Sequence, residues 1–61
     1  GEDKALGFAI GNVWKYVWRA ASVNAKHNSL PKQIQDLNKA AKYIEFAINI
    51  LEKENDIQDV P

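Results

Sequence analysis

The chain has 61 residues with eight basic and eight acidic side chains, so its formal net charge at pH 7 is zero. Zero net charge argues against nucleic-acid binding, which usually requires a basic excess. The absence of cysteine excludes disulfides and thiolate metal sites.

Neither a membrane span nor a secretory signal is visible in the sequence. No run approaches the roughly 20 apolar residues that a transmembrane helix needs. The basic start and the small-residue cleavage site of a signal peptide are missing, so we expect a cytoplasmic protein. The sequence starts at Gly1 and contains no methionine, so we expect residues upstream of it.

The first residues allow two interpretations. Residues 2–6 (EDKAL) either form the last turn of a helix that begins upstream, with Gly7 as its cap, or open one continuous helix from about Asp3 to Val23, with Asp3 as N-cap. Glycine inside a helix costs about 1 kcal/mol relative to alanine, and Gly11 follows one turn later. In the continuous helix, Gly7 and Gly11 would form a small-xxx-small pair that lets another backbone come close. We favour the short N-terminal turn that ends near Gly7.

The first main helix is predicted over residues 8–23. Three polar side chains, spaced by three and four residues, form one stripe along it: Asn12, Lys15 and Arg19. Apolar side chains cover most of the remaining surface: Ile10, Val13, Trp14, Val17, Trp18 and Ala21. This apolar arc is wider than a single partner helix covers.

A polar loop is predicted over residues 24–30, a second helix over residues 31–55 and a frayed tail over residues 56–61. Ser29 is a suitable N-cap, and Pro31 lies in the first turn, where its missing N–H is harmless. One apolar stripe repeats as a heptad: Ile34, Leu37, Ala41, Ile44, Ile48 and Leu51. A second stripe runs beside it: Ala40, Tyr43, Ala47 and Ile50.

We expect residues 1–61 to form one all-α domain, an antiparallel helical hairpin with a short N-terminal turn and two main helices. The heptad stripe suffices to pair with the first helix. The second stripe and the surplus on the first helix then require further neighbours, so a helical-bundle homo-oligomer is expected. The expected interface residues are Trp14, Trp18, Tyr43, Ala47 and Ile50.

The polar stripe of the first main helix is a candidate anion site. Arginine offers a planar fork for phosphate or carboxylate, lysine a point charge, and asparagine both a donor and an acceptor. Tyr16 lies beside them and can stack on a base or ring. The alternative is structural: Arg19 or Lys15 pairs with Asp36 across the hairpin, because Arg19 and Asp36 both lie near its loop.

No catalytic or metal site can be assembled from the sequence, and we expect no cofactor. His27, the only histidine, lies in the polar loop without a cysteine or a second histidine to share a metal. The phosphate-cradling patterns GxxxxGK[ST] and GxGxxG are missing, as is a Ser-His-Asp set. This favours a protein that is not an enzyme. The remaining charges are most simply a solvated face: Lys39, Lys42, Glu45, Glu52, Lys53 and Glu54.

Two segments together resemble a known family. LGFAIGNVWKYVWRA contains the pattern G-N-x-x-K-Y-x-x-R-A, and IQDLNKAAKYIEFAINIL contains D-L-x-K-A-x-x-Y-[LI]. Both patterns resemble a family of small phage and prophage proteins of unknown function, described as SaV-like and often labelled nucleotide-kinase-like. The resemblance covers about residues 6–51. The family's short basic glycine turn is replaced here by SVNAKHNSLPK.

The resemblance implies a ligand site made of residues from both helices: Asn12, Lys15, Tyr16, Arg19, Asp36 and Lys39. It implies a phage-type oligomer that binds a nucleotide or other phosphorylated small molecule in the host cytoplasm. Its role would be phage nucleotide metabolism or sequestration of a host-defence nucleotide signal. Two alternatives stay open. One is a protein-protein inhibitor or scaffold that docks on a host protein through the surplus apolar face; the other is a nucleoside-monophosphate kinase with a site shared between subunits.

Overall fold

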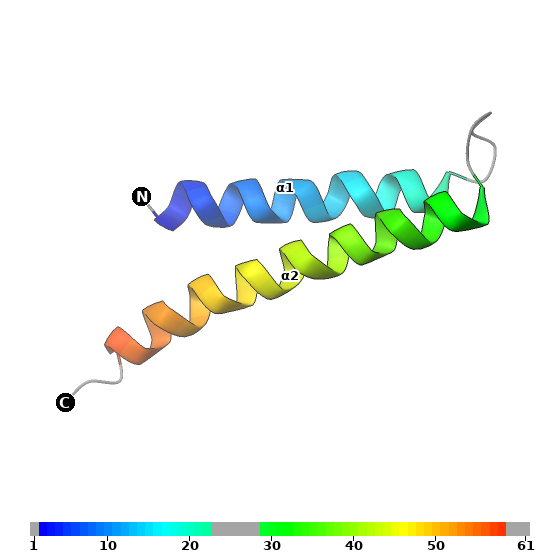
Figure 1. The fold of residues 1–61 in the computed structure, drawn as a ribbon. Coiled ribbons are helices and arrows are strands. Elements are labelled where there is room, and N and C mark those ends of the chain that lie inside the picture. The colour runs from blue at the N-terminus through cyan, green and yellow to red at the C-terminus, as the bar shows by residue number, and fades with distance from the viewer. Residues whose placement is uncertain (1, 23–28, 59–61) are drawn as a thin grey trace.

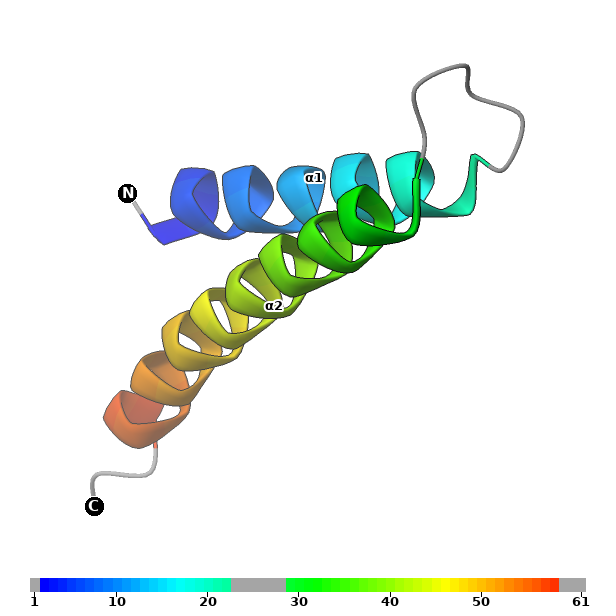
Figure 2. The ribbon, with the colours of Figure 1, turned by 45° about the vertical axis from the view of Figure 1, so that its right-hand side comes forward.

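A computed structural model describes residues 2–22 and 29–58. Within them the chain forms two helices, α1 (Glu2–Ala21) and α2 (Leu30–Gln58), and no strand. The helices run antiparallel and side by side, and α2 diverges from α1 toward its C-terminal end (Figure 1, Figure 2). The all-α class is therefore confirmed for this part of the chain. Neither described helix is long and apolar enough to cross a membrane.

The helix α1 is continuous through both of its glycines, so the predicted break near Gly7 is wrong. No described glycine has the positive φ that a left-handed cap would need. Packing against α2, where Ala9 is completely buried, outweighs a cost of about 1 kcal/mol per glycine. Asp3 lies in the first turn rather than at the N-cap, where its charge still favours the helix dipole.

The start of α2 confirms the predicted cap. The Ser29 hydroxyl accepts a hydrogen bond from the Lys32 amide at 3.4 Å, and the Ser29 carbonyl accepts one from the Gln33 amide at 2.8 Å. Pro31 lies in the first turn, as predicted. The helix continues to Gln58, so residues 56–58 are helical rather than part of a frayed tail. Residues 23–28, which include His27 and Val23, and residues 59–61 lie outside the described part.

The stripe of α2 that packs against α1 is the second one, which corrects the pairing expected from the sequence. Ala40, Ala47 and Ile50 are buried, and Tyr43 is half-buried. The large members of the heptad stripe are instead 45–60% exposed: Ile34, Leu37, Ile44, Ile48 and Leu51. Three of the residues expected between copies, Tyr43, Ala47 and Ile50, therefore face α1 of their own chain.

Small side chains explain this choice of stripe. The buried positions of α1 are Ala9 and Ala20, and those of α2 include Ala40 and Ala47. The distance between packed helix axes depends on the side chains at the contact, so alanines on both helices let the backbones approach closely. A large heptad residue at the same place would hold the helices apart.

Three contacts define the register of the hairpin. The Gln33 side chain donates a hydrogen bond from Nε2 to the Ala20 carbonyl at 2.9 Å, close to the loop. Farther along, the rings of Tyr16 and Tyr43 stack with centroids 5.9 Å apart. Near the open end, the rings of Phe8 and Tyr43 are 6.0 Å apart.

The hairpin has two different sides. Each residue of a helix is rotated by about 100° about the helix axis relative to the one before it. In an antiparallel pair, residues displaced in the same rotational direction from the line of contact, the seam, lie on the same side of the hairpin in both helices. Rotating one way leads to an apolar side: Ile10, Trp14, Val17, Leu37, Ile44, Ile48 and Leu51. Rotating the other way leads to a basic side: Lys4, Lys15, Arg19, Lys32, Lys39, Lys42 and Lys53.

Charge is therefore segregated although the chain is neutral. Every lysine and arginine in the described ranges lies on the basic side. Most of the acidic residues with described side chains lie elsewhere. Asp36 and Glu54 lie on the seam, and Asp3 and Glu45 lie on or beside the apolar side. Glu52 and Asp56, near the C-terminal end of α2, line a second pocket together with Lys53 and Phe46.

Candidate functional site

Three cations from two helices surround one tyrosine ring. The Lys15 ammonium lies 4.7 Å from the centroid of the Tyr16 ring, the Arg19 guanidinium carbon 5.6 Å and the Lys39 ammonium 5.4 Å. Each lies within the range in which a cation is attracted to the face of an aromatic ring. Lys15 and Arg19 come from adjacent turns of α1, and the hairpin register brings Lys39 to them from α2.

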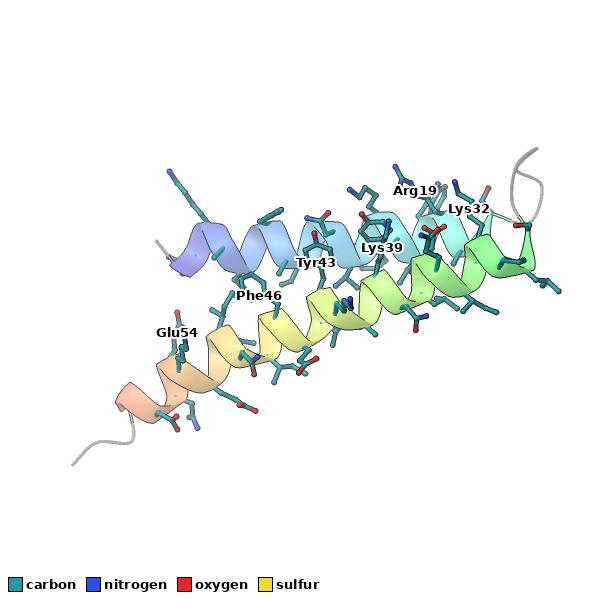
Figure 3. All side chains as sticks on the ribbon, in the orientation of Figure 1. Arg19, Lys32, Lys39, Tyr43, Phe46 and Glu54 are labelled. Atoms are coloured by element: carbon teal, nitrogen blue, oxygen red, sulfur yellow. The ribbon has the colours of Figure 1, made fainter. Side chains whose placement is uncertain are left out.

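A shallow pocket adjoins this cluster. Its volume is about 450 Å³, and it is lined by Tyr16, Lys39, Lys42, Tyr43 and Phe46. Figure 3 shows Arg19, Lys39, Tyr43 and Phe46 in one row along the side where the two helices meet. The row joins a cationic end to an aromatic end, so the pocket offers charge to one part of a ligand and apolar surface to another.

The aromatic floor follows from the spacing of residues on α2. Tyr43 lies one turn after Lys39, and Phe46 follows three residues later, so all three share one flank of the helix. The Tyr43 ring stacks on the ring of Tyr16, which also lines the pocket, and this contact holds Tyr43 in place. Aromatic pairs of this kind contribute about 0.5–1.5 kcal/mol beyond the area that they bury.

Asp36 is 4% exposed and is the buried charged residue of the described hairpin. It lies between Gln33, which contacts Ala20, and Lys39, which contacts Tyr16. The register therefore places Asp36 level with Arg19. A buried carboxylate is costly unless it is paired, so this position supports a structural pair between Arg19 and Asp36. Arginine has five N–H donors, so such a pair would leave some of them for a ligand.

Asn12 has a local partner. Its side-chain amide donates a hydrogen bond to the Phe8 carbonyl one turn earlier at 2.8 Å. The side chain is half-buried at the edge of the seam rather than extended beside Lys15 and Arg19. Its proposed ligand role therefore rests on the remaining amide groups and stays a prediction.

The structure brings together most of the predicted ligand residues. Lys15, Tyr16, Arg19 and Lys39 form one cluster. Sequence reasoning missed Lys42 and Phe46, which line the same pocket. The available signal was spacing: Lys42 lies three residues after Lys39, and Phe46 lies three residues after Tyr43. Trp14 and Trp18 are 70% and 75% exposed, and both point away from this cluster's side of the helix.

Nothing in residues 2–22 and 29–58 forms a group of three or more His, Asp or Glu side chains suited to a metal ion. Gly7 and Gly11 both lie inside α1. Neither therefore forms the flexible loop that cradles a phosphate in P-loop kinases. The chemistry available at this site is electrostatic and aromatic.

Fold and site together define a two-helix antiparallel hairpin with a cationic and aromatic side. A model of the family described as protein of unknown function (DUF3310) matches residues 2–45, which is most of the chain. The chain belongs to this family. Comparison with curated proteins and with solved structures found no match.

Proposed function

We propose that the basic side of the hairpin binds a nucleotide or another phosphorylated small molecule. The observation that carries this proposal is the convergence of Lys15, Arg19 and Lys39 on the Tyr16 ring. Three like charges around one ring repel one another, and the single carboxylate of Asp36, level with Arg19, offsets only part of that repulsion. A bound dianionic phosphate would remove that repulsion and gain charge-assisted hydrogen bonds.

The pocket matches the two halves of a nucleotide. The phosphate would lie against Lys15, Arg19 and Lys39, where α1 and α2 both supply donors. The base would lie toward Tyr43 and Phe46, whose rings offer faces for stacking. An open pocket of about 450 Å³ is large enough to hold a small ligand.

The biological setting that we propose is phage nucleotide metabolism or sequestration of a host-defence nucleotide signal, in the cytoplasm of the host. Binding alone serves sequestration, and it requires no catalytic group. A nucleoside-monophosphate kinase would need further groups from another subunit, because the described pocket holds cations and aromatic rings only.

Isothermal titration calorimetry with nucleoside monophosphates, nucleoside triphosphates and inorganic phosphate tests the proposal. Lys15→Ala and Lys39→Ala should each weaken binding by roughly tenfold, since a hydrogen bond to a charged group contributes about 1.5–3 kcal/mol. Lys4→Ala is the matched control, because it removes the same charge from the same side far from Tyr16.

Two results would contradict the proposal. One is no heat of binding with any nucleotide at millimolar concentration. The other is an equal loss in the Lys4→Ala and Lys39→Ala variants, which would indicate general charge attraction rather than a site.

A further inference from the structure

We propose that a second copy of the chain covers the apolar side, forming a twofold-symmetric, antiparallel four-helix bundle. The twofold axis would run parallel to the helices. Helix α1 of each copy would then lie on α2 of the other. This proposal is independent of the ligand, because the apolar and basic sides share no residue.

The hairpin by itself lacks a second layer. Its dimensions are 54 × 17 × 12 Å, which is one layer of two helices, whereas domains are built from two or more packed layers. Its buried apolar residues are Ile50 and four alanines, and no large side chain in the described part is fully buried. A single layer of two helices needs additional burial to be stable.

The apolar side supplies that burial. Trp14 is 70% exposed, and a buried aromatic side chain covers about 150–250 Å². Ile10 and Val17 flank it on α1, and the heptad stripe of α2 lies beside it, with large side chains that are 45–60% exposed. This is the scale of the roughly 800 Å² that each partner contributes to a standard interface.

A second copy fits this side because large side chains on one helix lie at the same level as small side chains on the other. A twofold axis parallel to the helices leaves every residue at its own level, so the register inside one chain also fixes the register between copies. Tyr16 is level with Lys39, so Trp14 is level with Ala41. The largest side chain of α1 would therefore lie over the smallest residue of the heptad stripe.

The same match recurs two helical turns away in each direction. Gly7 of α1 is level with Ile48 of α2, and Ala21 is level with Ile34. A Cβ atom built at Gly7 would meet nothing within 4 Å in a single chain. At these three levels a large residue faces a small one, which is the arrangement that lets two layers interdigitate.

Charge also selects this side. Pairing through the basic sides would bring the lysines of two copies together, at a cost in repulsion. Pairing through the apolar sides directs the two basic sides outward and away from each other. Each copy would keep its own candidate ligand site open to solvent.

Sedimentation equilibrium of the full chain without nucleotide tests the proposal. Ile48→Asp should weaken dimerisation by about 100-fold or more, because it buries a charge in an apolar interface. Phe46→Asp is the matched control: Phe46 is 49% exposed and Ile48 48% exposed, but Phe46 lies on the basic side. Its dimerisation constant should stay within about threefold of the original.

A size exchange tests the register. Trp14→Ala and Ala41→Trp should each weaken the dimer, and the double variant should recover most of the loss because the large and small residues exchange places. A double variant that loses as much as the sum of the two single variants would overturn the proposed register.

Variants that fail to fold do not weaken the test, since the unmodified chain provides its own measurement. Its melting temperature should rise with protein concentration, as for any folded dimer in equilibrium with unfolded monomers. A chain that stays monomeric and fully helical over a 100-fold range of protein concentration would overturn the proposal. So would equal effects of Ile48→Asp and Phe46→Asp, or a partner protein that binds this side of a stable monomer.

Discussion

Tyr16 is the residue on which the two helices and the candidate site meet. Its ring stacks on Tyr43 of α2 and carries three cations around it. It is half-buried, so it contributes both to the packing of the hairpin and to the surface that a ligand would contact. Changes at this position are therefore expected to affect stability and binding together.

Substitutions at Arg19 and Asp36 test a structural role separately from ligand binding. Asp36 is buried at the level of Arg19, so a double-mutant cycle of Arg19→Ala and Asp36→Ala should show a coupling of about 0.5–3 kcal/mol in the free energy of unfolding. Chemical denaturation of the four proteins gives this value. Additive effects of the two substitutions would show that the residues stabilise the chain independently.

At the scale of the helices, the sequence predicted the elements well and their pairing poorly. The two helices, the Ser29 cap and Pro31 in the first turn all follow from local signals, and local signals act within a few residues. The break predicted at Gly7 is wrong because packing around Ala9 stabilises the continuous helix by more than the two glycines cost. The heptad stripe was the wrong one to pair with α1. Hydrophobicity gives large side chains the greatest weight, whereas the helices pack through the stripe that contains the small residues Ala40 and Ala47.

The candidate site shows the same limit. Lys15, Tyr16 and Arg19 share one helix, so their grouping could be read from spacing. Lys39 was proposed from the family resemblance alone. The pocket positions of Lys42 and Phe46 depend on the register between the helices, and the buried alanines along that seam carry no strong sequence signal.

Ala9 tests the importance of close approach between the helices. It is 0% exposed, so Ala9→Leu inserts a large side chain where the backbones are close. Overpacking of this kind costs about 1–3 kcal/mol, and thermal unfolding followed by circular dichroism should show a lower melting temperature. Gly11→Leu is the control, because Gly11 is exposed and a Cβ atom there would meet nothing within 4 Å. An unchanged or higher melting temperature of Ala9→Leu would contradict this account of the seam.

At the scale of the whole molecule, the ligand site spans both helices. A nucleotide held by Lys15 and Lys39 would join α1 to α2 and would bind only the folded hairpin. Binding should therefore stabilise the fold by mass action, by about 2.7 kcal/mol at a free ligand concentration 100 times the Kd.

Differential scanning fluorimetry with the tightest-binding nucleotide of the calorimetric panel measures this linkage. The melting temperature should rise with nucleotide concentration in the original chain and in Lys4→Ala, and much less in Lys39→Ala. An equal rise in Lys39→Ala would place the ligand elsewhere.

The division of the hairpin into two sides has a consequence for how such proteins can diversify. The residues proposed to hold an anion and the residues proposed to hold a second copy are separate sets on opposite surfaces of the same two helices. A substitution at Lys42 or Phe46 can alter which ligand fits without touching the surface of assembly, and a substitution at Ile44 or Ile48 can alter assembly without touching the pocket. Two properties encoded in about 50 residues are thus free to vary separately.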